Sequence, residues 1–358
     1  MNILAIDTSC DETAAAVTHN NSVVSNVIWS QAAAHAKFGG VMPSLAQRMH
    51  EERINLVINK ALGRKHKNLQ GINMIAVTVG PGLSIALGVG VNKAIDLAKK
   101  HKLPIFPVNH LEAHVLSSFV KPKNNTEHTK TTIFPSFGLV VSGGNTVFLE
   151  IEKIGSYKIL AETQDDALGE ALDKCARMLG LGYPGGAILE KMAKEKKTNE
   201  ILLPIPLVGQ EKRKMFSYSG LKTSLLRLLQ TEQKKDANFP NKEDIFNLAY
   251  SFQDVAFKHL TRTISYIITD SNLRTNFLLV GGGVAANTEF RKRLNVVCRK
   301  NNIKLLKPYN NRLYGDNAAM VGVCAYLKFK SQNQPLRDFY NYSKIDRNPR
   351  LKIDSPQT

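Results

Sequence analysis

Residues 3–28 read ILAIDTSCDETAAAVTHNNSVVSNVI. Apolar runs at 3–7, 14–18 and 23–28 are separated by polar turns, which predicts three strands linked by hairpins. The first run ends in Asp7-Thr8-Ser9, so a carboxylate, two hydroxyls and backbone N–H groups follow the strand directly. Such a turn can hold a phosphate or a metal-bound water, although an ordinary hairpin turn has the same composition.

The next part of the chain alternates between helical and strand-like patterns. Helices are predicted at residues 43–62, 84–100 and 110–119, and buried strands at 73–79 and 104–108. Three hairpin-linked strands followed by alternating helices and strands predict an α/β domain.

The second half repeats this order of elements. Strand-like runs lie at residues 137–141, 147–151, 157–161, 277–280 and 304–306. Helices are predicted at 166–179, 218–230, 243–269 and 316–328, and a further helix begins near Ala285. The repetition predicts two similar lobes with a cleft between them.

Two glycine-rich turns in the second half can approach a ligand closely. VVSGGNT at 140–146 occupies the place that the turn after the first strand has in the first half. Its hydroxyl and N–H groups can donate to a phosphate. GGGVAAN at 281–287 lies between a strand and a helix start, where open N–H groups suit a nucleotide. A purely structural turn would need one glycine there rather than three.

The sequence HLEAH places His110 and His114 on one face of a predicted helix. This spacing is usual for two ligands of a divalent metal, and it also occurs by chance. Asp316 in GDNAAM is the best candidate for a third ligand, and capping of the following helix is its alternative role. Two histidines and a carboxylate suit Zn²⁺ or Fe²⁺. Glu112 lies roughly 200° around the helix from His110, unlike the base of an HExxH peptidase.

An acidic face is predicted on the helix at 166–179. Asp166, Glu170 and Asp173 have i, i+4, i+7 spacing. In a chain with a net charge of +18 this face is either solvated or, beside a nucleotide, able to bind ribose hydroxyls. The sequence leaves both interpretations open.

Composition restricts the partners. Of the net charge of +18 on 358 residues, +11 falls in residues 251–358, and this uneven distribution favours a nucleic-acid partner over general composition bias. The four widely spaced cysteines indicate neither a disulfide framework nor a zinc knuckle. No apolar run reaches the ~18 residues of a membrane span, and no leader pattern is found. We therefore expect a cytoplasmic protein without a membrane partner.

Together, the motifs resemble the TsaD-type tRNA N6-adenosine threonylcarbamoyltransferases. The similarity runs in order from about residue 1 to 328 and includes AIDTSCDETAAAV, HAKFGGVMPSLAQRMHEERI, PGLSIALGVGVNKA, NHLEAH, VSGGNT, DDALGEALDKCARMLGLGYPGG, FSYSGLKT, GGGVAAN and GDNAAM. The resemblance implies an α/β fold of two actin-like (ASKHA, RNase H-like) lobes with a ligand cleft between them. The expected lobes are residues 1–120, with the returning helix 316–328, and residues 121–315. A loosely packed polar tail is expected at 331–358.

The resemblance also implies an activity. A threonylcarbamoyl group would pass from threonylcarbamoyl-AMP to N6 of adenosine 37 in tRNAs that read codons starting with A, forming t6A. One divalent ion, iron or zinc, would be held by His110, His114 and Asp316. The residues implied to line the adenine-nucleotide site are Val140, Val141, Ser142, Gly143, Gly144, Asp173, Gly186, Glu190 and Asn287. Asp7 and Glu12 are the candidates for a catalytic base.

The same resemblance implies binding partners, and the sequence differs from the family pattern at two positions. Besides tRNA and threonylcarbamoyl-AMP, it implies a paralogous actin-like partner and a P-loop ATPase partner, as in bacterial complexes. Asn145 stands where many relatives have His, and Glu190 where some have a shorter polar or acidic residue.

Other functions are weighed against this one. An ATP-dependent kinase of the same fold needs only Mg²⁺ and carboxylates, and a metallopeptidase of the HExxH type needs a glutamate directly after the first histidine. The paired histidines with Asp316 therefore favour group transfer over both. Intact metal and nucleotide motifs also argue against a nucleic-acid-binding module without catalysis.

Overall fold

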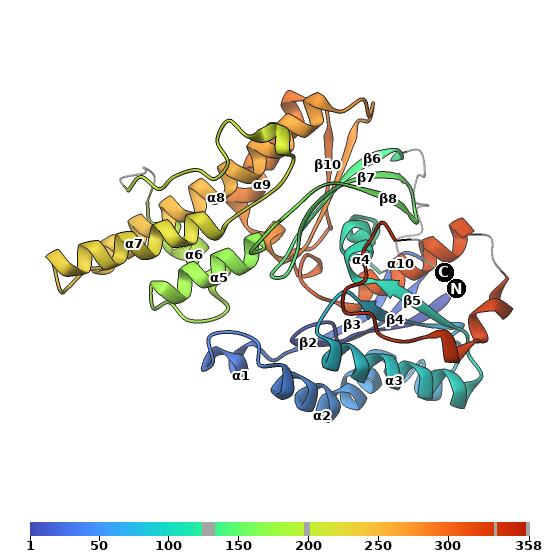
Figure 1. Cartoon of the computed structure of the whole chain (residues 1–358). Helices are drawn as coiled ribbons and strands as arrows, with labels where there is room; N and C mark the ends of the chain where they lie inside the picture. Colours follow the sequence, from blue (N-terminus) through green and yellow to red (C-terminus); the bar gives the residue numbers. More distant parts are fainter. Residues whose placement is uncertain (124–132, 197–200, 333–334, 356–358) are drawn as a thin grey trace.

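The computed structural model describes residues 1–123, 133–196, 201–332 and 335–355. Its strands form two five-stranded sheets (Figure 1). The first sheet has the order β3-β2-β1-β4-β5 and contains β1 (Asn2–Asp7), β2 (Glu12–His19), β3 (Ser22–Ser30), β4 (Met74–Gly80) and β5 (Ile105–Asn109). The second has the order β10-β9-β6-β7-β8 and contains β6 (Ser136–Val141), β7 (Thr146–Lys153), β8 (Ser156–Glu162), β9 (Phe277–Gly281) and β10 (Lys304–Leu306).

The two sheets have the same topology. In the first, β1 pairs antiparallel with β2 and parallel with β4, while β3 and β5 extend the edges. In the second, β6 pairs antiparallel with β7 and parallel with β9, and β8 and β10 take the edge positions. The predicted α/β fold with two similar lobes is confirmed.

Helices form three layers around and between the sheets (Figure 1). The helices of the described residues are α1 (Ala32–Ala36), α2 (Pro43–Leu62), α3 (Ser84–His101), α4 (His110–Leu116), α5 (Leu168–Met178), α6 (Gly185–Ala193), α7 (Ser219–Lys235), α8 (Lys242–Asp270), α9 (Thr288–Lys300) and α10 (Ala318–Gln332). Helices α2 and α3 cover the outer face of the first sheet, and α5 to α9 cover that of the second. Helices α4 and α10 lie between the two sheets. Within the described residues, no helix combines the length and the apolar character needed to cross a bilayer.

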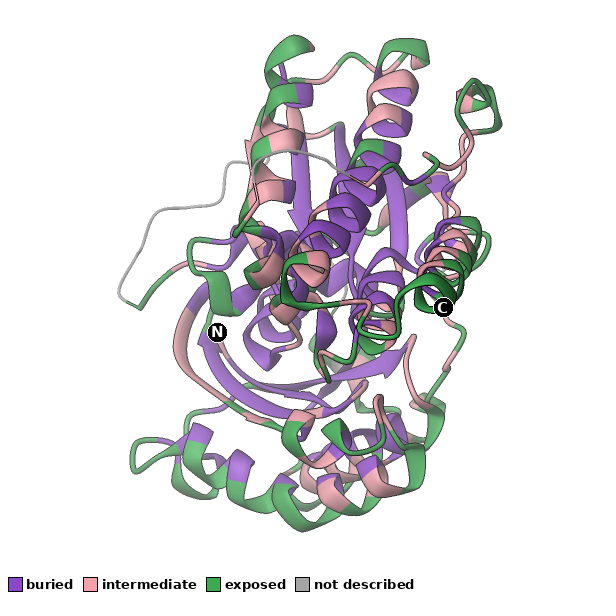
Figure 2. Cartoon of the chain, turned by 90° about the vertical axis from the view of Figure 1, so that its left-hand side faces the viewer, coloured by how far each residue is buried: buried purple, intermediate pink, exposed green. Residues whose placement is uncertain are grey.

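Strand alternation explains these layers. On β1, Ile3 and Ala5 pack toward α10 in the central layer, whereas Leu4 and Ile6 pack toward α2 and α3. Side chains alternate between the faces of a strand, so a strand covered on both faces becomes an almost continuous apolar run. Figure 2 shows both sheets buried inside a shell of partly exposed helices. The first sheet therefore needs α10 as a cover, although α10 follows the second sheet in the chain.

The division of the chain into lobes at residues 120 and 315 stays a prediction. Helix α10 contacts all five strands of the first sheet. Its Gly322 lies so close to β2 that a Cβ would be 2.7 Å from Oγ1 of Thr18. The expected junction at residues 121–132 falls largely outside the described part of the chain.

The polar tail expected at 331–358 stays a prediction, but part of it bonds to the first lobe. The backbone N–H of Asn348 donates to the carbonyl oxygen of Val79 at 2.7 Å, and the N–H of Gly82 donates to the carbonyl oxygen of Pro349 at 3.2 Å. Asn348 and Pro349 therefore lie against the end of β4 in the first lobe. A polar composition did not predict this, because the pairing uses main-chain groups that every sequence carries.

Replacing Gly80 by alanine tests the packing of the tail. A Cβ at Gly80 would overlap the carbonyl oxygen of Asn348, and the φ of +154° disfavours any side chain. We expect the free energy of unfolding to fall by about 1–3 kcal/mol, measured by denaturant unfolding, and residues beyond 341 to become sensitive to trypsin. Gly220→Ala, which points into open space on α7, is the control. Unchanged stability and protease resistance in Gly80→Ala would contradict this arrangement.

Candidate active site

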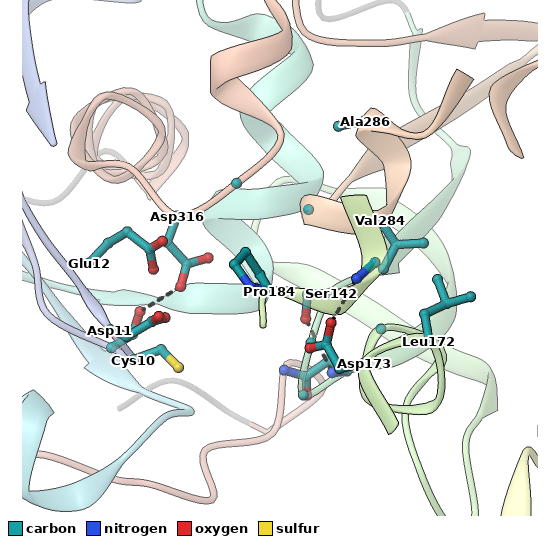
Figure 3. A pocket seen from close by; sticks show the side chains of 18 of the residues that line it. Cys10, Asp11, Glu12, Ser142, Leu172, Asp173, Pro184, Val284, Ala286 and Asp316 are labelled. Atoms are coloured by element: carbon teal, nitrogen blue, oxygen red, sulfur yellow. Dashed lines mark hydrogen bonds between the residues drawn. The ribbon is translucent and has the colours of Figure 1, made fainter. Parts of the chain in front are cut away.

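A cleft of about 600 Å³ lies where the strand ends of the two sheets meet (Figure 3). The first lobe lines it with residues 9–12 after β1, 81–83 after β4, His110 after β5, and Gly315 and Asp316 before α10. The second lobe contributes residues 142–145 after β6, Asp173 on α5, Gly186 and Glu190 on α6, and Val284 and Asn287 after β9. Ligands of open α/β sheets bind at such carboxyl ends of strands.

Three side chains from distant parts of the chain converge at the first-lobe side of this cleft. Nε2 of His114 lies 3.0 Å from Oδ1 of Asp316, and Nε2 of His110 lies 3.4 Å from the same oxygen. The two Nε2 atoms are 3.2 Å apart. One ligand atom from each residue lies within 4.8 Å of the others, so the predicted trio is brought together in space.

The N-terminus of α4 is held by a cap. Oδ1 of Asn109 accepts hydrogen bonds from the N–H groups of Leu111 at 2.9 Å and Glu112 at 3.2 Å. Nδ2 of Asn109 donates to the carbonyl oxygen of Lys352 at 3.2 Å. An N-cap satisfies backbone donors that a helix leaves unpaired. The position of the first histidine therefore depends on a contact with the C-terminal segment.

The side chains of the trio fit a metal ion. Two imidazole nitrogens and a carboxylate oxygen face one point, a donor set that suits Zn²⁺ or Fe²⁺. Without a cation, the two Nε2 atoms at 3.2 Å share one proton in a hydrogen bond. Behind them, Nδ1 of His110 and Oδ2 of Asp7 lie 3.8 Å apart, both buried and without a hydrogen-bond partner among the described residues. A cation at the convergence point would take the place of that shared proton and be bound by both nitrogen atoms and the carboxylate oxygen.

Charges around the trio shift its titration. Burial lowers the pKa of His110, but the carboxylates of Asp316 and Asp7 outweigh it and raise that pKa to about 9. Burial and the neighbouring His110 lower the pKa of His114. Burial alone would raise the pKa of Asp316, but the two histidines hold it well below its usual range. The carboxylate is thus kept ionised, which is the form that binds a metal.

The two carboxylates considered as bases occupy different places. Asp7 is fully buried behind His110 and does not line the cleft. Glu12 lines the cleft, and Figure 3 shows it beside Asp316. Burial, followed by the charges of Asp316 and Asp11, raises the pKa of Glu12 well above its ordinary value. Burial also raises the pKa of Asp7.

The second-lobe side of the cleft is formed by the turn between β6 and β7. The N–H of Ser142 donates to the carbonyl oxygen of Asn145 at 2.8 Å, and Oγ of Ser142 accepts from the N–H of Asn145 at 3.1 Å. These two bonds close the turn. A Cβ at Gly143 or Gly144 would meet nothing within 4 Å, so both glycines border open space in the cleft. Val140 and Val141 are fully buried in β6 and do not line it.

Asp173 accepts a hydrogen bond from the start of α6, and Glu190 accepts one from the start of α9, both beside the cleft. Oδ1 of Asp173 accepts from the N–H of Gly186 at 2.9 Å at the start of α6. Oε1 of Glu190 accepts from the N–H of Thr288 at 3.1 Å and pairs with Nζ of Lys194 at 2.8 Å. Burial raises the pKa of Asp173, although its backbone hydrogen bonds lower it.

The other two residues of the predicted acidic face are engaged elsewhere. Asp166 pairs with Lys174 at 2.5 Å and with Lys222 at 2.8 Å. Glu170 also pairs with Lys174, at 2.8 Å. Of the three carboxylates, Asp173 alone lines the cleft. Glu170 and Asp173 lie on α5, but Asp166 precedes the first residue of that helix, so the three carboxylates do not share one helix face.

Asn287 has a structural role that the sequence did not predict. Its Oδ1 accepts from the N–H of Phe290 at 3.0 Å and caps α9. Its Nδ2 donates to Oε1 of Gln253 at 2.8 Å. Asn287 still lines the cleft, beside Val284.

More than one of the three consecutive glycines is required by the fold, contrary to the expectation that one would suffice. A Cβ at Gly281 would overlap the carbonyl oxygen of His114 on α4, and one at Gly282, where φ is +95°, would overlap that of Val141. Both glycines are therefore required by packing and backbone conformation. Gly283 alone has open space around it.

Asp11 and Tyr183 are cleft residues that the sequence analysis missed. The hydroxyl of Tyr183, from the second lobe, donates to Oδ2 of Asp11, from the first, at 3.4 Å. Both line the cleft. Their signal was present, because Asp11 lies in the polar turn after the first strand and Tyr183 is the first residue of YPGG, but a contact between lobes leaves no periodic pattern.

Alanine at Gly281 tests how closely α4 packs on β9. We expect the free energy of unfolding to fall by about 3 kcal/mol or more, because backbone and not a flexible side chain blocks the new Cβ. Gly283→Ala is the matched control two residues away and should change it by less than about 0.5 kcal/mol. Denaturant unfolding measures both. Equal losses in the two variants would contradict the close contact.

Two lobes built on the same five-stranded sheet, with a ligand cleft between them, define an α/β protein of the actin-like class. The crystal structure of HypF from T. kodakarensis shares this fold with a TM-score of 0.60 and 14% identity, over 95% of this chain and 49% of that chain. Full-length HypF in a phosphate- and nucleotide-bound form aligns with a TM-score of 0.55 and 14% identity, over 94% of this chain and 47% of that one.

Sequence comparison identifies the family. The family model for TsaD, tRNA N6-adenosine threonylcarbamoyltransferase, matches residues 22–323. The tRNA N6-adenosine threonylcarbamoyltransferase of Trichlorobacter lovleyi is 41% identical over 341 residues, which cover 94% of this chain and 95% of the relative. That of Endomicrobium trichonymphae is 39% identical and covers 99% of both chains. The chain belongs to the TsaD family.

Proposed function

We propose that this protein transfers a threonylcarbamoyl group from threonylcarbamoyl-AMP to N6 of adenosine 37 in tRNAs reading codons that start with A, forming t6A. The observation that carries the proposal is that His110 and Asp316, two members of the convergent trio, line the same cleft as the open Gly143-Gly144 turn. Membership of the TsaD family supplies the reaction class.

The two sides of the cleft suit the two halves of the donor. The Gly143-Gly144 turn leaves backbone room for the phosphate of the adenylate, and Asp173 with Glu190 and Asn287 borders the space for the nucleoside. The acyl end then faces Asp316 and His110. An exocyclic amine is a poor nucleophile, so holding it against the acyl carbon is a large part of the catalysis. Because Glu12 faces the cleft and Asp7 does not, Glu12 is the better placed of the two proposed bases.

His110, His114 and Asp316 are the residues proposed to hold one iron or zinc ion. When bound, the ion supplies Lewis-acid polarisation of the acyl group. The chain itself keeps the three ligand atoms within 4.8 Å of one another, and it buries both histidines to less than a tenth of exposure. This burial excludes water from the side of the two histidines that faces away from the cleft.

The nucleic-acid substrate agrees with the charge of the chain. A net charge of +18 favours a polyanion, and an anticodon loop presents unpaired bases that can enter a cleft. We also propose a paralogous actin-like partner, a P-loop ATPase partner and a cytoplasmic location, as the family resemblance implies.

The structure gives no support to the alternative peptidase. Oε2 of Glu112 pairs with Nζ of Lys328 at 2.8 Å, and Oε1 accepts from the hydroxyl of Tyr157 at 2.8 Å. Glu112 is fully buried and does not line the cleft, so it is not placed to act on a substrate there. An ATP-dependent kinase has no use for two histidines at the convergence point.

Reconstitution tests the proposed reaction. Wild-type protein with its partner proteins, threonylcarbamoyl-AMP and unmodified tRNA should yield threonylcarbamoyladenosine, detected by mass spectrometry of tRNA nucleosides. His110→Ala should lose both the metal and the product, because two ligands rarely hold the ion. Metal content is measured by atomic emission. No modified nucleoside from metal-loaded wild-type protein would refute the function.

Gly143→Val tests the nucleotide side separately. The new side chain enters open space, so the protein should fold normally, but it occupies the room proposed for the phosphate. We expect the KM for threonylcarbamoyl-AMP to rise at least about tenfold, a loss of about 1.4 kcal/mol of binding, with metal content unchanged. Gly220→Val on α7, also in open space, is the control. An unchanged KM would place the phosphate elsewhere.

A further inference from the structure

Glu112 and Lys328 form a buried ion pair that the proposed reaction does not use. Oε2 of Glu112 lies 2.8 Å from Nζ of Lys328, and the two side chains are 0% and 2% exposed. Nζ of Lys328 also lies 6.0 Å from the centre of the Phe106 ring. Neither charged residue lines the cleft. The pair therefore has a role other than contact with substrate.

The pair joins the two helices that position the metal set. Helix α4 carries His110 and His114, and Asp316 lies two residues before the start of α10. Glu112 lies on α4 between the two histidines, and Lys328 lies on α10. All three proposed ligands are thus placed by one helix pair, and the ion pair connects the same two helices away from the cleft.

The three ligand atoms can meet only if α4 and α10 keep one relative position. A slide of either helix by one residue moves its side chains by about 1.5 Å along the axis and turns them by about 100°. The other contacts between these helices are made largely by apolar side chains of the central layer. Apolar burial is non-directional, whereas a charge-assisted hydrogen bond has a defined length and angle.

We propose that Glu112 and Lys328 are positioning residues that fix α4 against α10 and thereby set the geometry of the metal ligands. This inference rests on the metal set of the proposed function. Tyr157 of β8 holds the other carboxylate oxygen at 2.8 Å, so the carboxylate is also oriented from the second lobe.

A role in stability alone predicts a different outcome from a role in positioning. Replacing a buried ion pair by apolar side chains of similar volume is often neutral or stabilising, because two desolvated charges are removed together. Removal of one partner leaves an unpaired buried charge and destabilises strongly. The double variant Glu112→Leu/Lys328→Met, made in a Tyr157→Phe background so that no buried hydroxyl loses its acceptor, therefore separates folding from positioning.

Co²⁺ binding to the metal-free protein is the test. Cobalt is the probe because its visible absorption reports the number and geometry of its ligands. The double variant should unfold at the wild-type denaturant concentration or above it, yet bind Co²⁺ at least about tenfold more weakly and with an altered spectrum. Glu112→Gln, which keeps the side-chain shape and removes the charge, is a second variant. Its Co²⁺ affinity should lie between those of the wild type and the double variant.

Tyr157→Phe is the matched control. It removes one buried hydrogen bond to the same carboxylate but leaves the ion pair between the helices, so its Co²⁺ affinity should stay within about threefold of wild type. Wild-type affinity and spectrum in both Glu112→Gln and the double variant would overturn the inference and leave the proposed metal set intact. Failure of the wild-type protein to bind Co²⁺ would instead refute the metal set, and the inference with it.

Discussion

The close packing of α4 and α10 between the two sheets is the constraint on which the rest of the structure depends. The carbonyl oxygen of His114 occupies the space where Gly281 would have a side chain, and a Cβ at Gly322 would lie 2.7 Å from Oγ1 of Thr18 on the first sheet. With no side chain at these two points, the helix layer approaches both sheets. The strand ends of both lobes are then near enough to line one cleft. Larger residues there would separate the lobes, because protein interiors leave no spare volume.

The duplicated topology places different chemistry at equivalent strand ends. After β1 and β5 the chain has carboxylates and a histidine, whereas after β6 and β9 it has glycines that border open space. Identical sheets bring corresponding ends together, so the side chains at those ends were free to diverge without altering the fold. One side of the cleft is consequently rich in metal-binding groups, and the other leaves backbone room for a phosphate. A mixed anhydride, with a phosphate at one end and an acyl group at the other, has the same asymmetry.

Local sequence patterns predicted most of the fold. They could not predict backbone contacts between segments that lie far apart in the chain. The helix at 43–62 and the strand at 304–306 have the predicted bounds, since periodicity and a proline in the first turn are properties of the segment itself. The short helices α1 and α6 were missed. For the site, the spacing of His110 and His114 was sufficient because both lie on one helix. The roles of Gly281 and Asn287 depend on residues far along the chain, and no pattern within the segment contains them.

Adjacent cations in the basic C-terminal part also show that a local sequence pattern does not contain the contacts made with distant residues. In the sequence, Arg291-Lys292-Arg293 is a uniform cationic run, suited to a phosphate backbone. In the structure, the guanidinium of Arg293 pairs with Asp254 at 2.8 Å, and that of Arg291 lies 5.2 Å from the ring of Tyr314. Lys292 is 72% exposed, with only a loose 3.9 Å contact from its Nζ to Oε2 of Glu289. Net charge therefore overstates the surface available to tRNA, because some of the cations neutralise buried carboxylates or pack on aromatic rings. The electrostatic attraction that remains comes from residues such as Lys292, whose positions on the helix are set by the buried neighbours.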